Sequence, residues 1–256
     1  MLALRFTLPL AISIVVTLTA AQGPPQRDPQ ALALLQQSFV TMGGTVPTDL
    51  KAIGRITIEA GGSTETGTIR LLARGLDQTA EETDIGGSLK NVTFSRGFAK
   101  HREREADKQA SLELAVTSQS ASLPLQIIAA ALSDPETAFE YVGVEKISGA
   151  EVHHIRFWKT FDSKPKLQHL AEFSRRDIWV LAASGLPTQL SYVQRDAAGA
   201  ADRFRYDVTY SDFRNVGGIL QPFRIQNSLN GTPWATIEID EVTLHNGLAE
   251  SDFAIR

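Results

Sequence analysis

The sequence predicts an α+β protein built on one long, curled antiparallel sheet of about eleven strands, with two helices beside it. Apolar residues recur at three- and four-residue spacing in two segments, and they alternate with a period of two through most of the remaining chain. Gly-rich turns separate the alternating runs, which is typical of antiparallel hairpins. No change of composition divides the chain, so residues 28–256 are predicted to form a single domain.

The composition excludes several classes of function. The 256 residues include 25 Lys and Arg against 29 Asp and Glu, a net charge of −4 that argues against nucleic acid as the main partner. The chain contains no cysteine, which excludes disulfides, thiolate nucleophiles and cysteine-bound zinc.

Residues 1–21 match the pattern of a secretory signal peptide. Arg5 supplies a positive charge, residues 6–19 are apolar or small apart from Pro9, and Thr19 and Ala21 are the small residues before a cleavage site. We expect cleavage after Ala21, a flexible leader at residues 22–27, and a periplasmic or secreted location; the alternative is an uncleaved anchor helix. No cysteine stands at the boundary to carry a lipid, and no later segment has the roughly 20 apolar residues of a membrane span.

The first helix is predicted at residues 29–42. Asp28 and Pro29 suit the N-cap and the first helical position, and Gly43-Gly44 ends the helix. Its apolar stripe is Leu32, Leu35, Phe39 and Met42. The period then changes to two, and strands are predicted at 51–60, 66–74, 78–85 and 89–96.

Residues 96–122 follow neither period. Basic and acidic residues alternate between Arg96 and Lys108, which is typical of a solvated loop; the alternative is a flexible lid or a docking site for an acidic partner. A second helix is predicted at 124–132, before Asp134-Pro135. Eight further strands are predicted at 138–147, 152–159, 167–175, 178–182, 189–195, 203–213, 221–230 and 234–243.

The usual catalytic signatures are absent: the sequence has no P-loop, no His-Glu-x-x-His and no Gly-x-Ser-x-Gly. His153 and His154 are neighbours on a strand, so they should point to opposite faces. A hairpin centred near Ser163 would place His169 opposite Phe157, about 13 Å from His153, too far to share a zinc ion. We therefore expect no enzyme activity, no metal and no cofactor. Asp212 and Arg214 are spaced to form a surface ion pair.

Four segments carry a resemblance to a known family. They are 145–149 with the strand that follows; Ile178-Trp179-Val180 with 185–190; 208–214 with 217–219 and 221–225; and 237–242 with Asn246-Gly247-Leu248 and Ser251-Asp252-Phe253. Together they resemble the LolA-like superfamily of lipoprotein carriers and outer-membrane lipoprotein-sorting proteins, closely over residues 138–256 and loosely before. The resemblance implies a half-open β-barrel covered by two or more helices, a periplasmic place and an apolar cavity for acyl chains.

A curled sheet must fill its concave face with helices or with a ligand. We therefore expect a non-catalytic carrier-like protein that binds a lipid or an acylated lipoprotein. Face alternation suggests ten candidates for the cavity lining: Ile56, Ile58, Ile69, Leu71, Phe94, Phe157, Trp179, Tyr192, Phe223 and Ile225. The alternative is an interaction or sensory module of the envelope, with a filled core and a protein partner. An envelope hydrolase would need a polar triad that converges in a cleft.

Overall fold

In a computed structural model of the chain, the described residues are 26–95, 98–103, 106–109, 120–195 and 203–254. The predicted signal peptide at residues 1–21, its cleavage site and leader residues 22–25 lie outside these ranges, so those predictions stay predictions. The last two leader residues are described. The Gln26 carbonyl accepts a bond from the Phe139 N–H (2.8 Å), and Arg27 donates to the carbonyl of Asp134 (3.2 Å).

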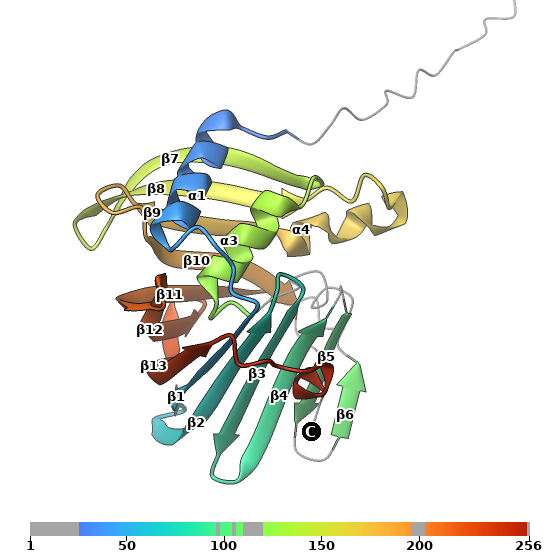
Figure 1. The fold of residues 1–256 in the computed structure, drawn as a ribbon, viewed down its shortest axis with the longest axis vertical. Coiled ribbons are helices and arrows are strands. Elements are labelled where there is room, and N and C mark those ends of the chain that lie inside the picture. The colour runs from blue at the N-terminus through green and yellow to red at the C-terminus, as the bar shows by residue number, and fades with distance from the viewer. Residues whose placement is uncertain (1–25, 96–97, 104–105, 110–119, 196–202, 255–256) are drawn as a thin grey trace, which may run out of the picture.

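The fold class is confirmed. One open antiparallel sheet of thirteen strands runs through the described residues, in the order β6-β5-β4-β3-β2-β1-β13-β12-β11-β10-β9-β8-β7 (Figure 1). The strands are β1 Asp49–Ala60, β2 Ser63–Arg74, β3 Gln78–Ile85, β4 Ser88–Ser95, β5 Phe98–Glu103, β6 Ala106–Gln109, β7 Thr137–Ile147, β8 Ala150–Lys159, β9 Arg176–Leu181, β10 Pro187–Arg195, β11 Arg203–Val216, β12 Ile219–Leu229 and β13 Thr232–Leu244. β5 and β6 form where the sequence predicted a loop or a lid, and they extend one edge of the sheet.

Both predicted helices are present: α1 Pro29–Thr41 and α3 Pro124–Ser133. The Asp28 carboxylate caps α1 by accepting bonds from the backbone N–H groups of Gln30 (2.8 Å) and Ala31 (3.0 Å). α1 ends before Gly43, whose φ of 121° suits glycine. Gly43 also lies against the β11–β12 turn, where a Cβ would lie only 2.7 Å from the Gly218 carbonyl oxygen.

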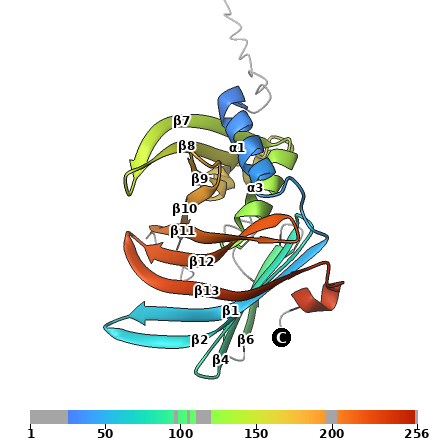
Figure 2. The ribbon, with the colours of Figure 1, turned by 60° about the vertical axis from the view of Figure 1, so that its left-hand side comes forward.

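The main core lies between the sheet and these two helices. Leu35 of α1 and Leu125 and Ile128 of α3 are fully buried, together with Phe139 and Ile155 of the sheet. Figures 1 and 2 show α1 and α3 side by side across the β7–β10 part of the sheet. We call the side of the sheet that carries this core the inner face, and the opposite side the outer face.

One predicted strand is wrong. Residues 167–175 belong to a 3-10 helix, η1 Pro165–Leu170, and to the short helix α4 Ala171–Ser174. They are helical because Leu170 and Phe173 bury with Phe161 in a small cluster of their own instead of joining the sheet. β8 pairs with β7 on one side and with β9 on the other. On the β9 side Phe157 lies opposite Arg176, and not opposite His169 as predicted.

A third helical turn, η2 Glu250–Phe253, covers the outer face of β2 and β3. Phe253 packs there on Leu72 and Ala80. The segment that leads to η2 is held by Asp49, whose carboxylate accepts backbone N–H bonds from Asn246 (2.6 Å) and Gly247 (3.0 Å). The last described residues are therefore tied back to the start of β1.

Candidate functional site: an inner hollow and an outer pocket

The inner face is not completely filled. A hollow of about 250 Å³ lies between β3–β4 on one side and β10–β13 on the other, and we call it the inner hollow. Its lining residues are Glu81, Val92, Phe94, Ser120, Ala121, Ser122, Tyr192, Gln194, Tyr206, Asn227 and Trp234. Helices α1 and α3 lie over the β7–β10 end of the same face, so this part of the face has no helix above it among the described residues (Figure 2).

Aromatic side chains form much of the wall of the inner hollow. The rings of Tyr192 on β10 and Tyr206 on β11 stack with centroids 5.3 Å apart and planes 10° apart, as expected for directly opposed residues on paired strands. Phe94 and Trp234 line the hollow from β4 and β13. The indole Nε1 of Trp234 is buried and has no hydrogen-bond acceptor among the described residues. The hollow is thus a partly aromatic space, and the indole donor of one lining residue is buried in its wall.

Among the described residues that line the inner hollow, one carries a carboxyl group. Glu81 Oε2 accepts hydrogen bonds from the hydroxyls of Ser120 (2.8 Å) and Ser122 (3.3 Å), just before α3. Burial raises the pKa of Glu81, and these two neutral donors only partly offset that effect. Glu81 therefore favours its uncharged form more than an exposed glutamate does, which keeps the charge inside the hollow low.

Arg176 is the buried cation of the inner face. It lies over the Tyr192 ring at 4.7 Å and donates to the backbone carbonyls of Phe173 (3.2 Å) and Arg175 (3.0 Å). Burial lowers its pKa to about 10. Arg176 is held by carbonyl oxygens and an aromatic ring, and it forms no ion pair with any of the described residues.

The structure separates the ten candidate lining residues into three groups. Phe94 and Tyr192 line the inner hollow. Seven others belong to the packed core or lie against it: Ile56, Ile58, Ile69, Leu71, Phe157, Phe223 and Ile225. Trp179 lies on the outer face, because it alternates with the inward Ile178 and Val180. The sequence analysis missed Glu81, although the period of two in β3 places Glu81 on the same face as its neighbours Leu71 and Val92.

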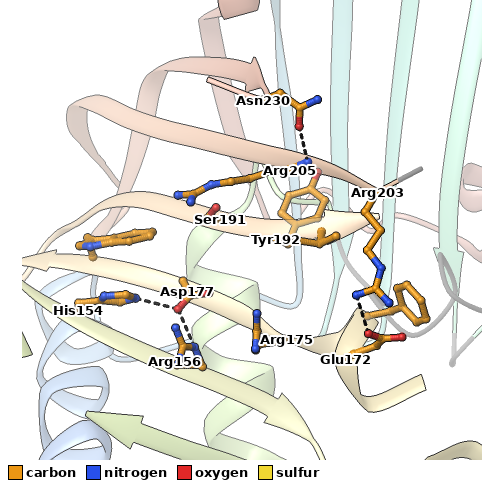
Figure 3. Close-up of a pocket in the computed structure, with 13 residues that line it drawn as sticks. His154, Arg156, Glu172, Arg175, Asp177, Ser191, Tyr192, Arg203, Arg205 and Asn230 are labelled. Carbon is orange, nitrogen blue, oxygen red and sulfur yellow. Dashed lines mark hydrogen bonds and ion pairs between the residues drawn. The ribbon is translucent and has the colours of Figure 1, made fainter. Parts of the chain in front are cut away.

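A second and larger pocket lies on the outer face of β8–β11, beside α4. It encloses about 460 Å³, and we call it the outer pocket (Figure 3). It is lined by His154, Arg156, Glu172, Phe173, Arg175, Asp177, Trp179, Ser191, Tyr192, Val193, Arg203, Arg205 and Asn230. Nothing in the sequence pattern marked this pocket, because its residues come from β8, α4, β9, β10, β11 and the turn between β12 and β13, which the fold brings together.

His154 is the centre of a hydrogen-bonded network in the outer pocket. Its Nδ1 lies 2.7 Å from Glu145 Oε1 and its Nε2 2.8 Å from Asp177 Oδ1, and its ring stacks on Trp179 at 4.3 Å. Arg156 Nε also donates to Asp177 (2.9 Å). Burial alone would lower the pKa of His154, but hydrogen bonds to the two carboxylates outweigh it and raise the pKa.

This network does not form a nucleophile–base pair. Both ring nitrogens of His154 are engaged by carboxylates, and the hydroxyl of Ser191, on the nearby β10, donates to Asp207 (2.6 Å). His153 points to the inner face, where its Nδ1 lies 3.1 Å from the Tyr141 hydroxyl, so the prediction that the two histidines diverge is confirmed. Within the described ranges no three His, Asp or Glu side chains are placed to hold a metal ion.

Comparison with known proteins identifies the fold. No family model matches the sequence, and no curated protein matches it. Solved structures do match: a domain named for outer membrane lipoprotein sorting, from Vibrio parahaemolyticus, is 14% identical with a TM-score of 0.58 over 88% of this chain and 96% of the other. A DUF1329 family protein from Desulfovibrio piger is 12% identical, with a TM-score of 0.57 over 90% and 98%.

A LolA superfamily protein from Nitrosomonas europaea is also 12% identical, with a TM-score of 0.56 over 88% of this chain and 97% of its own. At such identities the likeness concerns the fold alone, and it shows that this chain has a LolA-like fold. The resemblance drawn from the sequence motifs is confirmed at that level. No helix in the described ranges has both the length and the apolar content that a bilayer crossing demands.

Proposed function

We propose that this protein is a non-catalytic carrier of the periplasm or a secreted carrier, and that its inner hollow receives an acyl chain of a lipid or of an acylated lipoprotein. The observation that carries the proposal is the unfilled, partly aromatic space between β3–β4 and β10–β13. The LolA-like fold and the signal-peptide pattern of residues 1–21 support the same conclusion.

The chemistry of the hollow suits a chain with a small polar group. Each methylene that leaves water for an apolar site contributes about 0.8 kcal/mol, and the aromatic rings offer such contacts. The Trp234 Nε1 donor and the carboxyl of Glu81 lie among these rings.

Val92 provides the sharpest test of this site. It is half-buried on β4 and faces the inner hollow, so Val92→Phe adds a ring to the empty space. We expect purified wild-type protein to bind a fluorescent fatty-acyl probe with saturation, and native mass spectrometry after mild extraction to detect a bound lipid. Val92→Phe should weaken probe binding by about tenfold or more, since a filled hollow excludes several methylenes.

Val144→Phe is the matched control, because Val144 on β7 is 53% exposed and lies outside the hollow. This control should bind the probe as the wild type does. The proposal fails if the wild type comes out free of lipid and ignores acyl probes, or if Val92→Phe binds them with unchanged affinity while its thermal unfolding stays normal.

A second candidate function is an interaction or sensory module of the envelope. The full burial of Leu35, Leu125 and Ile128 between helices and sheet favours it, because that part of the inner face has no space for a ligand. Affinity capture from an envelope extract would separate the two functions. A carrier should capture lipid or acylated protein, and Val92→Phe should abolish this capture. An interaction module should capture its protein partner with or without that substitution.

A further inference from the structure

The outer pocket concentrates positive charge on a protein that is acidic as a whole. Among the described residues, its lining has four arginines against two carboxylates, whereas the complete chain has 25 Lys and Arg against 29 Asp and Glu. We propose that the outer pocket binds a phosphate group, carried by a small organic phosphate or by a phospholipid headgroup. This site lies on the face of the sheet opposite the main core, and the proposal does not depend on an acyl chain entering the inner hollow.

Both carboxylates of the lining already have cationic partners. Asp177 accepts from Arg156 Nε and lies 2.8 Å from His154 Nε2, and Glu172 pairs with Arg203 at 2.9 Å. The dashed lines in Figure 3 mark the Asp177 and Glu172 pairs. The negative charge of the lining is therefore neutralised without the use of Arg175.

Arg175 is the cation that remains. It is exposed, and among the described residues its guanidinium has neither a carboxylate partner nor a hydrogen-bond acceptor. Figure 3 shows Arg175 between the Asp177–Arg156 pair and the Glu172–Arg203 pair. A guanidinium presents its N–H groups as a planar fork that matches two oxygens of a phosphate, so the exposed Arg175 can bind an anion without giving up a protein partner.

The walls of the outer pocket suit the remainder of an organic phosphate. Phe173, Trp179, Tyr192 and Val193 line it with apolar surface, and the indole of Trp179 is fixed by its stack on His154 and its bond to Glu145 (2.9 Å). Arg205 is positioned by Asp207 through its Nε (3.0 Å), which leaves the rest of its guanidinium fork available for oxygen atoms.

The test is a titration of the full chain with inorganic phosphate, with glycerol phosphate, and with vesicles of neutral lipid that contain or lack an anionic phospholipid. Arg175→Gln combined with Arg203→Gln should weaken phosphate binding by about tenfold or more, because charged hydrogen bonds are among the stronger ones. The matched control is Arg55→Gln with Arg224→Gln. It removes the same charge from arginines that pair with Glu238 elsewhere on the outer face. The side chains of Arg55 and Arg224 are 61% and 52% exposed, close to the 54% of Arg203.

Soluble phosphates that bind to the wild type and to the control, but not to the Arg175/Arg203 variant, would support a site for free organic phosphate. The same dependence seen only with anionic vesicles would assign the site to a lipid headgroup. Absence of binding to either probe, or an equal loss in both arginine variants, would overturn the proposal. Val92→Phe should leave phosphate binding unchanged, so failure of the inner hollow as an acyl site would be a separate result.

Discussion

The inner hollow and the outer pocket are built from opposite faces of the same sheet, yet their chemistry differs. On β10, Gln194 lines the inner hollow and Val193 lines the outer pocket, while Tyr192 reaches both. Among the described lining residues, the hollow holds one carboxyl whose pKa is raised by burial, and the pocket holds four arginines. Because side chains alternate along a strand, one short segment can line two cavities of different chemistry at the same time.

The largest expected effect separates the filled part of the inner face from the hollow. Leu125→Ala on α3 removes a fully buried side chain and should lower the free energy of unfolding by about 2–5 kcal/mol. Val92→Ala should cost no more than about 1 kcal/mol, because Val92 borders empty space. Denaturant unfolding of both variants measures the difference, and equal losses would mean that the hollow is packed as tightly as the core.

The next effect concerns the carboxyl of the hollow. Since the folded-state pKa of Glu81 is raised, the unfolded chain loses this proton first, and stability should fall as pH rises above the ordinary value of 4.5. The loss approaches about 1.4 kcal/mol for each pH unit until the folded-state pKa is passed. Glu81→Gln should remove this loss, so its stability advantage over the wild type should grow with pH. A constant difference from pH 4.5 upward would contradict the burial of this charge.

On the outer face stability should also fall as pH rises, but here the charged form of the group is the one that stabilises the fold. The raised pKa of His154 means that the protonated ring stabilises the fold, and this contribution is complete below the ordinary value of 6.5 and lost as pH rises through the folded-state pKa. The groups that face the ring are Glu145, Asp177, Arg156 and Trp179. His154→Gln should therefore cost more stability in mildly acidic than in alkaline buffer. Thermal unfolding across that range is the measurement, and a pH-independent cost would refute the charged network.

The smallest effect is expected outside both sites. Asp212 and Arg214 form the surface ion pair that their spacing predicted, at 2.6 Å. Solvent screens such pairs, and asparagine tolerates the positive φ of 53° at Asp212. Asp212→Asn should leave the unfolding midpoint, acyl binding and phosphate binding unchanged. This variant sets the baseline against which changes in the hollow and in the pocket are judged.

Much of the fold could be predicted from local patterns. Both helices and most strands follow from spacing, and the cap at Asp28 occurs as expected. Residues 167–175 were mistaken for a strand, although Leu167, Leu170 and Phe173 recur at three-residue spacing and Pro165 suits a helix start. Over so short a segment the spacing fits both a helix and a strand. The helix forms because Leu170 and Phe173 pack with Phe161.

The candidate site was less predictable. Among the ten residues proposed for the lining, Phe94 and Tyr192 border the hollow, and seven others belong to the packed core or lie against it. Trp179 lies on the outer face, opposite to its neighbours Ile178 and Val180 on β9. Glu81 was missed because a lone carboxylate in a strand gives no sign that two serines, 39 and 41 residues away, will enclose it.

The sequence by itself determined which segments alternate, where glycine and proline allow turns, and that one face of a long sheet would be apolar, since these properties depend on neighbours along the chain. Only the tertiary structure decided which inward side chains α1 and α3 cover and which remain beside empty space. It alone gathered Arg156, Arg175, Arg203 and Arg205 around one pocket, because the positions of these side chains depend on how β8, α4 and β11 pack in three dimensions.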